Sequence, residues 1–129
     1  MITKAIIPVA GWGSRRLPIT KAIEKCMLPI GNRPLVDYVV QDCLQAGISE
    51  LIFIVGEQSE QLQNYYRSNI TLNDYLRRKG KMDLLDMVAP ITATLHFVTQ
   101  PSYGKYGTAV PVALAADYLQ DGESAVVLM

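Results

Sequence analysis

The chain has 129 residues, half of them apolar and 19% charged, which is typical of one globular domain. Twelve basic and twelve acidic residues give a formal net charge of zero, which disfavours a general nucleic-acid binder. No apolar run reaches the length of about 18 residues that suits a membrane span, and the two cysteines, Cys26 and Cys43, lack metal-ligand spacing. We therefore expect a cytoplasmic protein with reduced thiols and no membrane or nucleic-acid partner.

Apolar runs alternate with helical stretches, which is typical of an α/β fold with a mostly parallel sheet. The first predicted strand covers residues 4–9, with Pro8 tolerable near its end. A helix over 34–46 follows, with Pro34 in its first turn and Gly47 as its stop. The helix residues expected to face the core are Leu35, Tyr38, Val39, Cys43 and Leu44.

A wholly apolar strand at 51–55 predicts a central position in the sheet. Residues 57–88 predict two or three short helices. The remaining expected elements are a strand over 94–99, a loop over 100–106, a helix over 107–119 and a strand over 125–129. We therefore expect a three-layer, Rossmann-like fold. Because the last apolar run stops at Met129, we interpret residues 1–129 as the N-terminal part of a longer protein, with a sheet incomplete at the C-terminus.

The loop from Ala10 to Pro18, directly after the first strand, is the most informative stretch for function. Its glycines let backbone N–H groups approach a ligand, and an arginine adds charge-assisted hydrogen bonds to phosphate. The alternative is a tight turn with surface arginines. Two common nucleotide motifs are excluded: Arg16 stands where the dinucleotide fingerprint needs a third glycine, and the P-loop ending is absent.

Lys25 precedes a stiff Met-Leu-Pro segment and lies ten positions after Arg15 of this loop. A lysine fixed there can neutralise charge on a reacting phosphoryl group, although a solvated surface lysine is the competing interpretation.

The run from Lys4 to Pro34 resembles the sugar-nucleotide pyrophosphorylases, a family of nucleotidyltransferases. The family signature is G-x-G-[ST]-R-x-x-P, a threonine, and K-x-x-x-P-[VI]-x-x-[KR]-P. The matching positions are Gly11, Gly13, Ser14, Arg15, Pro18, Thr20, Lys25, Pro29, Ile30, Arg33 and Pro34. The residues between these positions are most similar to those of the bacterial UTP–glucose-1-phosphate uridylyltransferase branch.

The resemblance implies roles for individual residues. The nucleotide-binding set is Ala10, Gly11, Gly13, Ser14, Gln100 and Gly107, with Gln100 reading the pyrimidine edge. Arg15 binds the phosphates that leave as pyrophosphate, and Lys25 holds those at the reacting centre. The implied reaction is nucleotidyl transfer from UTP to glucose 1-phosphate, giving UDP-glucose and pyrophosphate, with Mg²⁺ bridging, in a homo-oligomer.

Three departures from the family pattern affect this interpretation. Cys26 replaces a usual glutamate, and Gly104-Lys105-Tyr106-Gly107-Thr108 replaces a usual leucine-glycine-leucine-glycine-histidine stretch. The family's metal-binding aspartate follows the strand that ends this chain, so we expect the Mg²⁺ ligands beyond residue 129 and no activity from residues 1–129 alone. The alternatives are a non-catalytic nucleotide-binding paralogue, or a thymidylyl- or cytidylyltransferase for another sugar 1-phosphate.

Other reactive or aromatic residues carry weaker signals. His96, the single histidine, lies in a strand pattern and is interpreted as structural. Lys25 next to Cys26 would lower a thiol pKa, but no other residue makes Cys26 a nucleophile. Tyr65 and Tyr66 are interpreted as packing residues. Trp12 either lines the nucleotide pocket or covers the loop.

Overall fold

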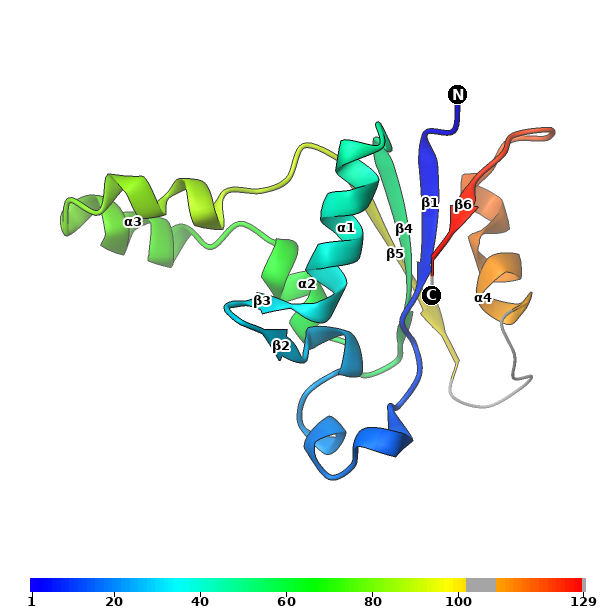
Figure 1. The fold of residues 1–129 in the computed structure, drawn as a ribbon, viewed down its shortest axis with the longest axis horizontal. Helices are drawn as coiled ribbons and strands as arrows, with labels where there is room; N and C mark the ends of the chain where they lie inside the picture. The colour runs from blue at the N-terminus through cyan, green and yellow to red at the C-terminus, as the bar shows by residue number, and fades with distance from the viewer. Residues whose placement is uncertain (102–108, 129) are drawn as a thin grey trace.

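A four-stranded parallel sheet forms the centre of the computed structural model, which describes residues 1–101 and 109–128 (Figure 1). The strand order is β5-β4-β1-β6, with β1 at Lys4–Pro8, β4 at Glu50–Gly56, β5 at Thr94–Gln100 and β6 at Val126–Val127. All three strand pairings are parallel. The first strand and the wholly apolar strand therefore lie inside the sheet, as predicted for the apolar strand.

Side chains of β1 alternate between the two faces of the sheet, as the pleat requires. Ala5 and Ile7 pack with one core cluster, and Ile6 packs with the other. Pro8 ends the strand opposite Ile54, and the next N–H, that of Val9, donates to the Ile54 carbonyl at 2.8 Å. The missing proline N–H thus falls where the strand gives way to a loop, as the sequence indicated.

Helices cover both faces of the sheet (Figure 1). On one face lie α1, Leu35–Gln45, and α2, Gln61–Tyr66. On the other lie α4, Ala109–Leu114, and the 3₁₀ turn η6, Ala115–Tyr118. The predicted three-layer α/β fold is confirmed. The last two elements occupy the place of the single helix expected over 107–119, whose first two positions lie outside the described residues.

The predicted end of α1 is confirmed, whereas its predicted core face is partly wrong. Gly47 adopts φ 88° and donates to Leu44, while Ile48 donates to Cys43, so two free carbonyls of the last turn are satisfied. The buried residues of this helix are Val36, Asp37, Val40 and Cys43. Leu35 and Tyr38, expected in the core, are exposed, because Leu35 lines a cavity and the Tyr38 hydroxyl donates to the Ile30 carbonyl.

Two further regions complete the described chain. The short helices expected over 57–88 are confirmed as α2, α3 at Ile70–Arg78, and the 3₁₀ turns η4 at Met82–Leu84 and η5 at Asp86–Val88. Figure 1 shows α3 projecting away from the sheet. A hairpin of β2, Pro29–Ile30, and β3, Arg33–Pro34, was not predicted. Within the described residues, no helix is long and apolar enough to cross a membrane.

Candidate functional site

The loop after β1 folds into three 3₁₀ turns beyond the carboxyl ends of the strands: η1 at Ser14–Arg16, η2 at Ile19–Lys21 and η3 at Lys25–Met27 (Figure 1). Since β1, β4 and β5 are parallel, Gln100 at the end of β5 lies at the same edge. The glycine loop and Gln100 therefore share this edge. In open α/β sheets this is the edge where ligands bind.

Gly13 packs against the residue predicted to hold the reacting phosphates. It adopts φ 65°, and a Cβ built on it would lie 3.0 Å from both the Cβ of Lys25 and the Cγ2 of Thr20. The Thr20 hydroxyl donates to the Gly13 carbonyl at 2.9 Å. The fold itself therefore requires glycine at position 13.

Gly11 differs from Gly13, because the described protein places no such requirement on it. Its φ is not positive, and a Cβ there would meet no described atom within 4 Å. The space beside its backbone stays open to a ligand.

A cavity of about 480 Å³ connects the two glycines to Lys25. Its walls are mostly apolar side chains of β1 and α1, and Lys25 is the charged residue among those that line it. Of the predicted site residues, Gly11, Gly13 and Lys25 line this cavity. The remaining predicted residues are placed as follows: half-buried Ala10 in the loop, exposed Ser14 and Arg15 on η1, half-buried Gln100 at the end of β5, and Gly107 outside the described residues.

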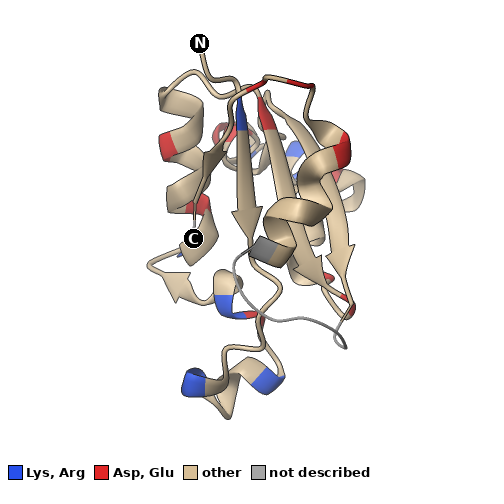
Figure 2. Cartoon of the chain, turned by 90° about the vertical axis from the view of Figure 1, so that its right-hand side faces the viewer, with Lys and Arg blue, Asp and Glu red and all other residues tan. Residues whose placement is uncertain are grey.

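The loop after β1 is rich in Lys and Arg (Figure 2). Its basic residues are Arg15, Arg16, Lys21 and Lys25. Across residues 1–101 and 109–128, none of these four side chains forms an ion pair or hydrogen bond. The acidic residue of this loop, Glu24, does not pair with these cations, because its carboxylate accepts hydrogen bonds from Ser59 and Gln61. An edge of this kind attracts anionic ligands.

The Gln100 side chain has a buried oxygen without a partner in the described part of the chain. Among residues 1–101 and 109–128, no group donates a hydrogen bond to its Oε1 atom. A buried acceptor without a donor costs about 1–3 kcal/mol, and such a group in a native fold calls for an explanation. A ligand N–H at this edge would satisfy it.

Glu24 is a residue of this region whose contacts the sequence did not reveal. Its carboxylate accepts hydrogen bonds from the Ser59 hydroxyl at 2.5 Å and from the backbone N–H groups of Gln61 at 2.8 Å and Leu62 at 3.3 Å. The partners lie 35 to 38 positions away in the chain. No local motif signals a contact at that separation.

Cys26 is buried and lines the same cavity, with 9% of its surface exposed. Burial, aided by the nearby charge of Glu24, raises the pKa of its thiol to about 12. The expected lowering by Lys25 is therefore wrong, because desolvation of the thiolate dominates. The thiol is protonated at neutral pH, and both cysteines are free, as predicted.

In the part of the chain that the structure describes, no three His, Cys, Asp or Glu residues gather in a way that could hold a metal ion. The described residues do not supply a magnesium site, and ligands beyond residue 129 stay a prediction.

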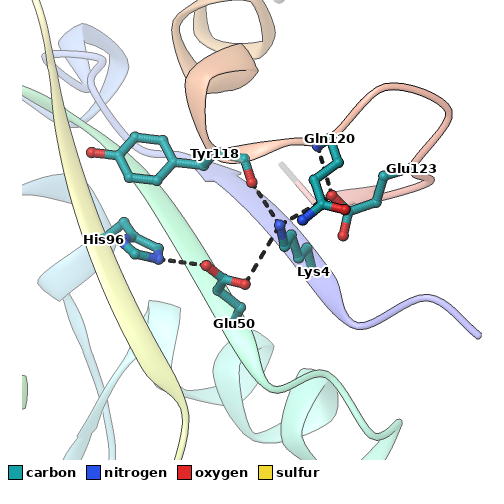
Figure 3. Close-up of polar contacts among 6 residues, drawn as sticks. All are labelled: Lys4, Glu50, His96, Tyr118, Gln120 and Glu123. Carbon is teal, nitrogen blue, oxygen red and sulfur yellow. Dashed lines mark hydrogen bonds and ion pairs between the residues drawn. The ribbon is translucent and has the colours of Figure 1, made fainter.

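A second polar cluster lies at the opposite, amino edge of the sheet (Figure 3). The Lys4 ammonium donates to Glu123 at 3.0 Å and to the Tyr118 carbonyl at 2.7 Å, and lies 3.6 Å from Glu50. The His96 ring forms a hydrogen bond with the Glu50 carboxylate, with 2.6 Å between Nε2 and Oε1, and packs on the Tyr118 ring. The geometry fits the structural role predicted for His96.

Hydrogen bonds shift two pKa values in this amino-edge cluster. The bond to Glu123 raises the pKa of Lys4. The backbone N–H of Gln120, followed by Lys4, lowers the pKa of Glu123.

The chain is similar to known proteins over nearly its whole length. A UTP–glucose-1-phosphate uridylyltransferase of Streptococcus pyogenes is 41% identical over 115 residues, which make up 88% of this chain and 38% of that protein. Two Acinetobacter baumannii structures, a UDP-glucose pyrophosphorylase and a UTP-bound UGPase, match with TM-scores of 0.90 at 33% and 32% identity. Each match covers 100% of this chain and 45% of the other.

The chain spans about two fifths of the length of the curated relatives it matches. The nucleotidyl transferase family model matches residues 4–129. This match begins at the first residue of β1 and runs through every strand of the sheet. The resemblance seen in the sequence is thereby confirmed, and the chain belongs to the nucleotidyl transferase family.

Proposed function

We propose that the complete protein transfers a uridylyl group from UTP to glucose 1-phosphate, giving UDP-glucose and pyrophosphate. The observation that carries the proposal is the cavity at the carboxyl edge, which Gly11, Gly13 and Lys25 line together. Family membership and relatives named for this reaction support it. The phosphate oxygen of the sugar phosphate attacks the α-phosphorus of UTP, and the bond to the β-phosphate breaks as pyrophosphate leaves.

The assigned roles follow the distribution of charge in the loop. Arg15 holds the β- and γ-phosphates, and Lys25 neutralises charge at the reacting phosphorus. Backbone N–H groups of Ala10, Gly11, Gly13 and Ser14 hold the nucleotide. Both cations lack a partner within the described chain, which supports a role toward phosphate.

Gln100 is assigned to the base. Its buried Oε1, which has no partner among the described residues, is a hydrogen-bond acceptor, and N3 of uracil carries the hydrogen that such an acceptor needs. Cytosine has no hydrogen on N3, so this contact disfavours the cytidylyl alternative. Thymine carries the same N3–H group, so the contact leaves the thymidylyl alternative open.

A divalent metal is general in this family, and we propose Mg²⁺ held by ligands beyond residue 129. A homo-oligomer in the cytoplasm is also proposed, and the two free, buried cysteines are compatible with that compartment.

The test is turnover by the complete protein supplied with UTP, glucose 1-phosphate and Mg²⁺, with release of pyrophosphate and UDP-glucose measured. UTP should be preferred over TTP and CTP when each is tried with glucose 1-phosphate. Nucleotide binding without turnover would indicate the non-catalytic paralogue, and a preference for TTP would indicate the thymidylyl alternative.

A variant at Gly11 separates ligand binding from folding. Gly11→Ala should weaken UTP binding by calorimetry while leaving the melting temperature unchanged, because a Cβ there meets only open space in the described protein. Unchanged UTP affinity would contradict the assignment of this loop to the nucleotide.

A further inference from the structure

Helix α2 begins without a cap of its own. The first N–H groups of a helix have no partner within it. The residue at the N-cap, Glu60, makes no capping hydrogen bond with its side chain. The Glu24 carboxylate, from the loop beyond β1, accepts from the N–H groups of Gln61 and Leu62 instead. A negative charge at this end of a helix is also favoured by the helix dipole.

The connection between the two segments is reciprocal. The backbone N–H of Glu24 donates to the Gln61 side-chain oxygen at 2.8 Å, and the Gln61 side-chain nitrogen donates to the Ala22 carbonyl at 3.1 Å. The Ser59 hydroxyl holds the second carboxylate oxygen of Glu24. Hydrogen bonds therefore fix both the backbone and the side chain of Glu24, the residue directly before Lys25.

The other side of Lys25 is held by packing. Its Cβ lies against Gly13, at a distance that leaves no room for a side chain at position 13. The Lys25 ammonium itself has no ion-pair or hydrogen-bond partner among residues 1–101 and 109–128. The position of this cation in the cavity therefore depends on its backbone and on its first side-chain carbons.

We propose that Glu24 is a positioning residue, which fixes Lys25 against the reacting phosphate by anchoring its backbone to the N-terminus of α2. The inference rests on the proposed function, in which Lys25 neutralises charge in the transition state. A displacement of about 1 Å at a reacting centre can lower a rate about 100-fold. Loss of the anchor should therefore affect kcat, even though Glu24 has no assigned contact with substrate.

The test compares four variants of the complete protein: Glu24→Ala, Glu24→Gln, Lys25→Ala and the double variant with Ala at both positions. Glu24→Ala should lower kcat about tenfold, with the KM for UTP changed less than about twofold. Glu24→Gln keeps an acceptor oxygen for the α2 N–H groups and should recover most of that loss. Because Glu24 acts through Lys25, the double variant should have the same kcat as Lys25→Ala alone.

Asn69→Ala is the matched control for a lost helix cap. The Asn69 side chain accepts a hydrogen bond from the Leu72 N–H at 3.0 Å and caps α3, which projects away from the site (Figure 1). This variant should lower the melting temperature and leave kcat unchanged.

Three results would overturn the inference. Glu24→Ala could behave like Asn69→Ala, with a lower melting temperature and a normal kcat, or its effect on kcat could multiply with that of Lys25→Ala in the double variant. In both of these cases the role of Lys25 in the proposed function survives. A normal kcat in Lys25→Ala would overturn both proposals.

Discussion

The two edges of the sheet treat their polar side chains in opposite ways. At the amino edge, Lys4, Glu50, His96 and Glu123 satisfy one another within a single network (Figure 3). At the carboxyl edge, the cations of the loop after β1 and the Gln100 oxygen have no partner in the described chain.

This contrast separates stability from function. Polar groups that bond one another contribute to the fold, whereas groups left unsatisfied are expected where a ligand completes the hydrogen bonding. Substitutions at the amino edge should therefore change stability, and those at the carboxyl edge should change binding and catalysis.

The largest effect is expected where the carboxyl edge also has a structural requirement. In Gly13→Ala, the alanine must adopt the left-handed backbone conformation of Gly13, which costs about 1–2 kcal/mol. Its Cβ would also press against Lys25 and Thr20, which costs about 1–3 kcal/mol more. Gly31→Ala is the control, because it shares the positive φ but its Cβ would meet no described atom within 4 Å. Urea unfolding should show the larger loss for Gly13→Ala, and equal losses would contradict the close packing.

Lys25→Ala tests whether the carboxyl edge serves catalysis and not stability. A hydrogen bond to a charged group is worth about 1.5–3 kcal/mol, so kcat should fall roughly 10- to 150-fold. The unfolding free energy should change little, because the ammonium makes no ion pair or hydrogen bond with the described protein. Steady-state kinetics and urea unfolding of the complete protein measure the two quantities. A loss of stability with a normal kcat would show that Lys25 serves the fold and not catalysis.

Arg15→Ala should act mainly on substrate binding. The leaving phosphates are bound in both ground and transition states, so the KM for UTP should rise about tenfold, with a smaller effect on kcat. Arg16→Ala, the neighbour on the same exposed turn, is the matched control and should change KM little. An equal effect of the two substitutions would show that the register of the loop is wrong.

The smallest effect is expected at the amino edge. The pKa of Glu123 is lowered from its ordinary value of 4.5, chiefly by the Gln120 N–H. A lowered pKa stabilises the fold above the ordinary value, and this contribution is lost as the pH falls through the folded value. Glu123→Gln should therefore weaken the dependence of the melting temperature on pH below about 4.5 and leave kcat at neutral pH unchanged. An altered kcat would contradict the expectation that the amino edge affects stability alone.

Local sequence patterns predicted the strands of the sheet and the end of α1 well. Apolar runs located the strands, and Gly47 located the end of α1, because both signals act over a few residues. The hairpin of β2 and β3 was missed although Gly31-Asn32 is a known turn pair, since the flanking prolines argue against strands. The buried face of α1 was partly missed, because Tyr38 bonds a hairpin that the sequence did not predict.

The site was predicted in part for a similar reason. The signature residues Gly11, Gly13 and Lys25 are close in sequence and meet in one cavity. Glu24 was overlooked because its partners lie on α2 and just before it, far along the chain. The thiol of Cys26 was misjudged because the charge of a neighbour is visible in a sequence, whereas burial is not.

The order of the strands has a consequence for synthesis of the chain on the ribosome. Ala5 of β1 pairs with Leu51 on one side and with Val126 on the other. At about 5–20 residues per second, several seconds separate the appearance of these two partners. During that interval the newly made β1 offers an open, apolar edge to other chains, which favours nonnative pairing. Strand β1 thus leaves the ribosome before β4 and is enclosed on both sides only after β6 has followed.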